Sequence, residues 1–176
     1  RIAERPTIWI DLSAPGWNGP LFVAVPRSGL EGVSMSQVVC VACGAGNRLP
    51  EDRDPLSAKC GRCKSLLFTG GPTAVTGAEL DRHRRMTKGT ALLLDVWAPW
   101  CGPCRQLAPT LEELSKTMAD KVKVVKMNVD ESQQIPGEMG IRSIPTLILF
   151  KNGQKVDTQV GSMPLAALTK MIESHL

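Results

Sequence analysis

All six cysteines of this chain occur in pairs separated by two residues, at positions 40/43, 60/63 and 101/104. Two thiolates at this spacing can share a metal ion or exchange electrons as a dithiol and a disulfide. A secreted disulfide scaffold would rarely space its cysteines so uniformly, whereas paired cysteines in intracellular chains are typical of metal ligands and redox dithiols. The sequence therefore predicts thiol chemistry in a reducing compartment, the cytoplasm.

The first two pairs have the spacing of a four-cysteine zinc site. Sixteen residues separate Cys40-Val41-Ala42-Cys43 from Cys60-Gly61-Arg62-Cys63, which is typical of a ribbon built from two knuckles. Each two-residue spacer forms a tight turn that aims two sulfurs at one tetrahedral ion. Four protein ligands leave no position for water, so the predicted zinc site is structural, although two further redox dithiols are an alternative interpretation.

The third pair lies where a buried strand is predicted to turn into a helix. Residues 91–97 contain an apolar run interrupted only by Asp95, which is typical of a strand covered on both faces. Residues 102–118 have helical spacing of leucines, and Pro103 is tolerated in the first turn. Cys101 would then lie at the helix N-terminus, where free N–H groups and the helix dipole favour a thiolate.

The segment from Trp97 to Cys104 reads Trp-Ala-Pro-Trp-Cys-Gly-Pro-Cys and resembles the active site of the thioredoxin family. The resemblance covers residues 72–176, and the four-cysteine module makes the chain from Met35 onward similar to the zinc-carrying branch of bacterial thioredoxins. It implies a protein-disulfide reductase that acts as a monomer on disulfide-containing client proteins. It also implies recycling by an NADPH-dependent thioredoxin reductase, with no cofactor at the dithiol.

We assign the attack on a client disulfide to Cys101, because the first cysteine is expected to be the more exposed. Cys104, one helical turn further on, would resolve the mixed disulfide. Asp95 is an acid in a buried strand, so its pKa should be raised. The resemblance makes Asp95 the proton acceptor for Cys104 and places Lys126 beside it; without the resemblance, Lys126 would be interpreted as an ordinary strand-edge lysine.

Pro145 begins a predicted buried strand, which is a position where a cis peptide bond is expected. The resemblance implies that this cis proline faces the dithiol and that the backbone of Ile144 pairs with an extended substrate segment. It adds the following residues to an apolar docking surface: Trp100, Gly102, Pro103 and Gly161. The Gly102-Pro103 dipeptide accompanies strongly reducing behaviour in the family, about −270 mV.

The rest of the chain from residue 72 predicts alternating helices and strands, and hence an α/β fold. We expect a mixed central sheet with helices on both faces, preceded by the small zinc ribbon. Thr76 and Glu79 have the form of a capping box, and Asn152-Gly153 that of a two-residue hairpin turn. Besides residues 91–97 and 102–118, the predicted elements are a helix from 76 to about 88, a strand at 122–127, a short helix near 132–139, strands at 146–150 and up to 160, and a helix from 164.

The division into parts follows from these patterns. We predict a zinc ribbon at residues 35–71 and a thioredoxin domain at residues 72–176. Residues 1–34 contain several Pro and Gly positions but no convincing secretion signal, so we expect a disordered extension upstream of a native start at Met35.

Composition excludes several other classes of protein. The net charge of +4 is spread along the chain, and no basic run suggests nucleic-acid binding. No apolar run approaches the about 20 residues of a membrane span. The cluster from Arg82 to Arg85 is expected on the solvated face of a short helix, and both His83 and His175 are expected to be exposed and without a role.

Two alternative functions use the same residues. One is an oxidase or isomerase of the same fold, against which the Gly102-Pro103 dipeptide argues. The other is an interaction module in which the ribbon and the α/β domain serve only as docking platforms. Replacing Cys101 by serine separates the binding-only interpretation from the enzymatic ones, because only an enzyme needs the thiolate.

Overall fold

The computed structural model describes residues 8–11, 22–25 and 35–176. Its contacts divide the chain into two compact units, Arg1–Val33 and Ser34–Leu176. In the first unit, strand β1 (Ile8–Asp11) pairs antiparallel with β2 (Phe22–Val25). This strand pair was not predicted from the sequence. The rest of the predicted disordered extension lies outside the described residues.

The four-cysteine module is a small hairpin-based structure at the start of the second unit. Strands β3 (Met35–Val39) and β4 (Gly46–Pro50) pair antiparallel, and the first cysteine pair occupies the turn between them. A 3₁₀ turn, η2 (Pro55–Ser57), leads to the second pair. The apolar cluster of this module is small and includes Ala119 from the larger α/β part: Val38, Leu49, Ala58, Leu67, Phe68 and Ala119.

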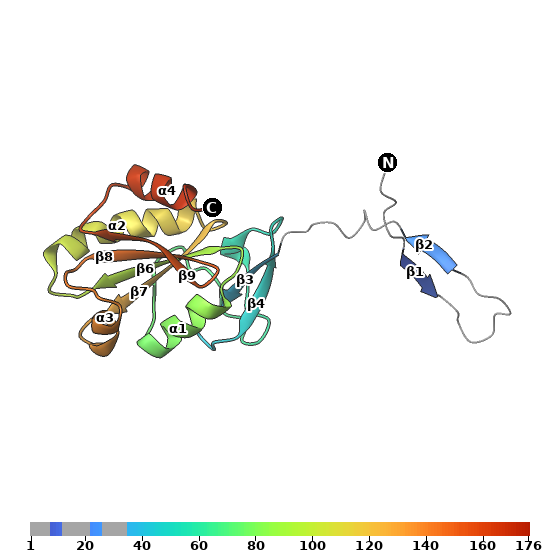
Figure 1. The fold of residues 1–176 in the computed structure, drawn as a ribbon, viewed down its shortest axis with the longest axis horizontal. Helices are drawn as coiled ribbons and strands as arrows, with labels where there is room; N and C mark the ends of the chain where they lie inside the picture. The colour runs from blue at the N-terminus through green and yellow to red at the C-terminus, as the bar shows by residue number, and fades with distance from the viewer. Residues whose placement is uncertain (1–7, 12–21, 26–34) are drawn as a thin grey trace. The chain divides into compact units, whose positions relative to one another are not determined.

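The α/β part is built on one five-stranded mixed sheet with the strand order β5-β7-β6-β8-β9 (Figure 1). The central strand β6 pairs parallel with β7 and antiparallel with β8. The strands are β5 (Thr73–Ala74), β6 (Ala91–Trp97), β7 (Val122–Asn128), β8 (Thr146–Lys151) and β9 (Gln154–Val160). The bounds of β6 agree with the predicted strand, whereas the two-residue β5 was not predicted.

Helices cover both faces of this sheet, as Figure 1 shows. Because side chains alternate along a strand, Leu93 packs under α2 and α4 whereas Leu92 and Leu94 pack on the side of α1. The helices are α1 (Gly77–Met86), α2 (Gly102–Thr117), α3 (Gln134–Glu138) and α4 (Leu165–Glu173). The predicted α/β architecture is therefore confirmed.

Local sequence signals set several element boundaries. Thr76 and Glu79 form the predicted capping box at the start of α1, each side chain bonding to the other's backbone N–H. Asn152 and Gly153 both have positive φ, 52° and 89°, which the tight β8–β9 turn requires. No helix in the described part of the chain is long and apolar enough to cross a membrane.

The prediction that His83 is exposed is wrong. Its side chain is only 1% exposed, on the underside of α1. Burial, together with the nearby positive charge of Lys123, lowers the pKa of His83 to about 4. A cluster of three arginines and one histidine looked uniformly polar in sequence, but helical geometry turns one of its four members inward.

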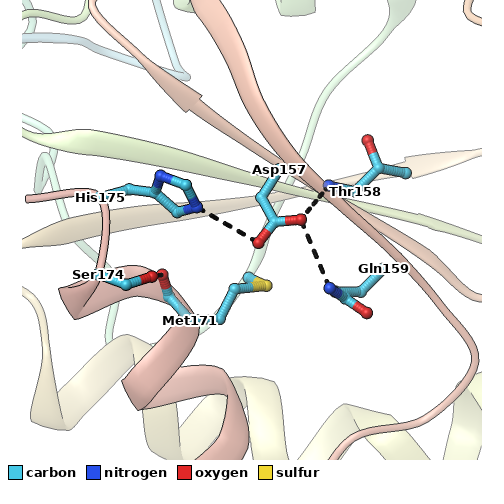
Figure 2. A network of polar contacts seen from close by, with 6 residues as sticks. All are labelled: Asp157, Thr158, Gln159, Met171, Ser174 and His175. Atoms are coloured by element: carbon cyan, nitrogen blue, oxygen red, sulfur yellow. Dashed lines mark hydrogen bonds and ion pairs between the residues drawn. The ribbon is translucent and has the colours of Figure 1, made fainter.

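The C-terminal helix is held to the edge strand by Asp157, as Figure 2 shows. One carboxylate oxygen lies 3.4 Å from Nε2 of His175, and the other accepts the backbone N–H of Thr158 at 2.7 Å. Ser174 turns its hydroxyl back to the carbonyl of Met171 at 2.7 Å. His175 is thus half-buried against Asp157 of β9. The prediction that its side chain is exposed is therefore wrong.

Candidate functional site

The dithiol lies at the junction of β6 and α2, as the sequence predicts. Cys101 is the N-cap of α2 and forms a disulfide with Cys104 in the first turn. The backbone N–H of Cys104 donates to Sγ of Cys101 at 3.2 Å. In the reduced protein this donor would stabilise negative charge on Cys101. The two residues are 5% and 4% exposed, so the expected difference in their exposure is slight.

Asp95 lies on the same face of β6 as Leu93, the face covered by α2. It is 6% exposed, and burial raises its pKa to about 7, although the charge of Lys126 opposes this shift. Among the described residues, none donates a hydrogen bond to its Oδ1 atom. A carboxyl group with a pKa near 7 can both accept and return a proton at physiological pH.

Lys126 is the direct neighbour of Asp95 in the parallel register of β6 and β7. Its Nζ lies 5.0 Å from the centre of the Trp97 ring, so the ammonium is held over an aromatic face. The predicted pairing of the acid and the lysine in space is therefore present. Trp97 lies beneath the dithiol together with Ala98, as expected of a packing residue.

A cavity of about 530 Å³ is lined by the buried acid and by residues of α2. Asp95, Lys126 and three residues of α2 line it, namely Cys104, Arg105 and Glu112. Its remaining wall includes residues 69–72, which join the four-cysteine module to the α/β part. The link between the two parts of the chain therefore borders the space around the buried carboxyl.

The loops facing the dithiol contain the predicted docking residues. The Ile144–Pro145 peptide bond is cis, as expected. The N–H of Gly161 donates to the carbonyl of Pro145 at 2.8 Å, and Gly161 has a φ of +92°, which side chains disfavour. Ser162, which sequence reasoning did not select, donates its hydroxyl to the carbonyl of Pro103 at 3.2 Å.

Trp100 is 65% exposed beside the dithiol, and Val160 next to Gly161 is 64% exposed. Exposed apolar side chains mark a protein-binding surface when several of them gather around one site. The indole N–H of Trp100 donates to both carboxylate oxygens of Asp130, at 3.2 and 3.1 Å. Sequence reasoning missed Asp130 because no local pattern links an acid after β7 to a tryptophan thirty residues earlier.

The four N-terminal cysteines come together in one cluster, with their sulfur atoms within 4.8 Å of one another. Sγ of Cys40 lies 3.6 Å from that of Cys63, and Sγ of Cys43 lies 3.7 Å from that of Cys60. These separations are too long for disulfides. They match the about 3.8 Å expected between thiolates bound at about 2.3 Å in a zinc tetrahedron. The residues therefore fit zinc.

The second knuckle is also set up to ionise. Backbone N–H groups of Cys63 and Arg62 stabilise the thiolate of Cys60 and lower its pKa to about 6. In the first knuckle, by contrast, burial and the neighbouring cysteines raise the pKa of Cys43 to about 11. Gly44 ends the first knuckle with a φ of +70°. The low pKa of Cys60 and the turn at Gly44 favour metal binding, because only the thiolate is a zinc ligand and because a tight turn must aim both sulfurs.

Comparison with known families gives two matches on this chain. Residues 73–174, more than half of the chain, match the family model described as thioredoxin. Residues 39–65 match the model described as the N-terminal part of thioredoxin 2, a zinc ribbon. The two matches cover the dithiol site and the four-cysteine cluster, respectively.

Individual relatives agree with these family matches. The chain is 58% identical over 85 residues to a thioredoxin from Haemophilus influenzae, covering 48% of this chain and 79% of that protein. It is 47% identical over 103 residues to thioredoxin 1 from Synechococcus elongatus, covering 58% and 95%. A solved thioredoxin from Malassezia sympodialis superposes with a TM-score of 0.55 at 36% identity, covering 65% of this chain and 98% of that one.

Proposed function

Because this chain belongs to the thioredoxin family, we propose that it is a general protein-disulfide reductase of the cytoplasm that carries one structural zinc ion. The observation that carries the reductase function is the Cys101–Cys104 disulfide at the start of α2, next to a buried acid. The enzyme is a thiol-disulfide oxidoreductase that cycles between this disulfide and a dithiol.

The first step is an attack by Cys101 on a client disulfide. In the reduced enzyme the N–H of Cys104 and the other free N–H groups of the first turn of α2 stabilise the Cys101 thiolate. The thiolate forms a new S–S bond with one client sulfur, and the second client sulfur leaves as a thiolate. The lone pair of Cys101 has then become the new S–S bond, and the electron pair of the broken S–S bond has stayed on the leaving client sulfur. The client is now joined to the enzyme.

The second step needs Cys104 as a thiolate, and Asp95 is the group we propose as its proton acceptor. With a pKa of about 7, the carboxylate can take the Cys104 proton and later release it through the adjoining cavity. Cys104 then attacks Sγ of Cys101, and the client leaves with both of its sulfurs reduced. Lys126 stabilises the carboxylate form of Asp95 and thereby lowers the pH at which Asp95 gives up its proton.

Clients are proposed to dock on the apolar surface around the dithiol. Its residues are Trp100, Gly102, Pro103, Ile144, Pro145 and Gly161. An extended client segment would pair with the backbone of Ile144, while the exposed rings and aliphatic groups bury apolar client side chains. Because backbone pairing is independent of client sequence, this surface suits many different clients.

The zinc ion would be held by Cys40, Cys43, Cys60 and Cys63, whose spacing supports a closed tetrahedral site. When bound, the ion supplies folding free energy to a module with a very small apolar cluster. A redox-sensing role for these four thiolates is a second part of the proposal. It predicts that peroxide releases zinc and changes the activity.

Partners and organisation complete the proposal. An NADPH-dependent thioredoxin reductase would return the disulfide to the dithiol, and the protein would act as a monomer. We place the zinc ribbon at residues 35–71 and the thioredoxin domain at residues 72–176, which the two family matches support. Limited proteolysis with mass spectrometry would test whether the first cleavage within residues 35–176 falls near residue 71.

A coupled assay tests the reductase function. Purified protein, thioredoxin reductase, NADPH and insulin are combined, and NADPH oxidation is followed at substoichiometric protein. The proposed function requires turnover by the wild type and none by Cys101→Ser, whereas Ser162→Ala serves as a control that keeps both sulfurs. Turnover that survives in Cys101→Ser would remove the dithiol mechanism, and absence of turnover in the wild type would overturn the reductase function and leave the oxidase or isomerase and the interaction module as alternatives.

A further inference from the structure

Lys123 on β7 is the most unusual charged residue outside the dithiol site. It is 2% exposed, although lysine is almost never fully buried without a partner. It points to the α1 face of the sheet, because Val122 and Val124 on either side pack toward α2. No carboxylate lies within ion-pair distance of it in the described part of the chain.

The ammonium group of Lys123 instead contacts the four-cysteine module. Its Nζ donates to the carbonyl of Val39 at 2.7 Å and to the carbonyl of Leu67 at 2.9 Å. It also lies 5.3 Å from the centre of the Phe68 ring. Val39 precedes the first cysteine of the cluster, and Leu67 follows the last cysteine by four residues. One side chain of the α/β sheet therefore binds the chain on both sides of the segment that contains the four cysteines.

The charge of Lys123 also fits the cluster. Four thiolates around one Zn²⁺ carry a net double negative charge, and Cys40 directly follows Val39, whose carbonyl accepts the hydrogen bond from Lys123. A second cation approaches the same knuckle, because the guanidinium of Arg82 lies against Gly44. A buried cation that has no carboxylate partner and two carbonyl partners is best satisfied when an anionic cluster lies beside it.

We propose that Lys123 is a positioning residue for the zinc site, supplied by the thioredoxin domain to the ribbon. This inference rests on the zinc binding in the proposed function. By fixing the residue before the first knuckle and the chain after the second, Lys123 keeps the two knuckles facing each other, and its charge offsets that of the tetrathiolate. The metal site is thus completed by a residue 60 positions beyond the last ligand.

Zinc release from the full chain tests this inference. Zinc content per chain is first measured by elemental analysis of the wild type, and release is then followed as transfer of zinc to the chromophoric chelator 4-(2-pyridylazo)resorcinol. The variants are Lys123→Met, which removes charge and donor, and Lys123→Gln, which keeps a donor. Lys123→Arg restores the charge, and Lys121→Met is the matched control on the neighbouring exposed lysine.

We expect zinc release to become about 10-fold faster or more in Lys123→Met, which is the scale of an outer-shell contact to a metal ligand. Lys123→Gln should be nearly as fast, Lys123→Arg slower than both, and Lys121→Met unchanged. Insulin reduction by each variant reports whether the dithiol part is folded. If Lys123→Met does not fold, the comparison of zinc release from the Gln and Arg variants decides whether the charge of Lys123 matters.

The outcomes separate this inference from the function beneath it. A wild type without zinc would remove the zinc part of the proposed function. One zinc per wild-type chain, with release from the Met and Gln variants as slow as from the wild type, would overturn the role of Lys123 alone. Release from Lys123→Arg as fast as from Lys123→Gln would likewise overturn it, because charge would then have no effect.

Discussion

The indole N–H of Trp100 is bound by the carboxylate of Asp130, so the exposed ring beside the dithiol is tethered to the loop after β7. Asp130 is itself oriented, because its backbone N–H donates to the side chain of Asn128 at 3.1 Å. A large apolar ring held in one orientation loses less conformational entropy when a client binds than a free ring does. The tether therefore favours client docking without touching the sulfurs.

Replacing Asp130 by asparagine should weaken docking more than chemistry. Loss of a charge-assisted hydrogen bond at an exposed site costs about 1 kcal/mol, so KM for insulin should rise about fivefold while kcat stays near the wild-type value. Steady-state kinetics with insulin as the client measure this change. Asp120→Asn is the control, and an equal fall in kcat would contradict the docking role.

The raised pKa of Asp95 predicts that stability falls as pH rises. Because the folded-state pKa is about 7 and the unfolded value is 3.8, the folded protein holds the extra proton between these values. The free-energy cost of ionising Asp95 in the folded state is absent below pH 4, grows between pH 4 and 7, and reaches about 4 kcal/mol above pH 7. Asp95→Asn should thus be more stable than the wild type at pH 8 but not at pH 4 in urea unfolding. Equal stability at pH 8 would sink this expectation.

The same substitution should slow turnover. Without a proton acceptor, resolution of the mixed disulfide by Cys104 loses assistance, and we expect a fall of roughly 10- to 100-fold at pH 7. The pH profile is the sharper readout: the wild type should gain activity with an apparent pKa near 7, and Asp95→Asn should lack that rise. An unchanged profile would mean that another group accepts the proton.

His83 predicts a loss of stability at acid pH. Its folded-state pKa of about 4 is below the ordinary value of 6.5, so the unfolded chain binds the proton more readily between these values. Stability is therefore lost as pH falls below 6.5, by about 2 kcal/mol at pH 5. His83→Leu should lose less stability than the wild type between pH 7 and 5, measured by urea unfolding with zinc content checked at each pH. Parallel losses would contradict the burial of a neutral imidazole.

The four-cysteine cluster predicts a definite count of thiols. The reduced wild type should contain one zinc and two titratable thiols before denaturation, because only the dithiol cysteines are then free of metal. Denaturation with a chelator should expose all six cysteines. After peroxide, the sensing role requires loss of zinc together with a change in insulin reduction. Zinc content that stays constant under peroxide would argue for a purely structural ion.

Much of the candidate site follows from local sequence. Cys101 and Cys104 are three positions apart, so their proximity needs only one helical turn, and the apolar run before them predicts the central strand. The spacing of the other four cysteines likewise predicts two knuckles, because each knuckle is a local turn. These features depend on a few neighbouring residues, and the structure places each of them as expected.

Other features were decided only by tertiary structure. The pairing of Asp95 with Lys126 follows from the register of two strands, and the burial of Lys123 and His83 follows from the packing of the ribbon and α1 on the sheet. The partners of these side chains lie far away in the chain: Lys123 is 84 residues from Val39. Sequence periodicity reports which face of an element is apolar, but it carries no information about which distant polar group a buried side chain will meet.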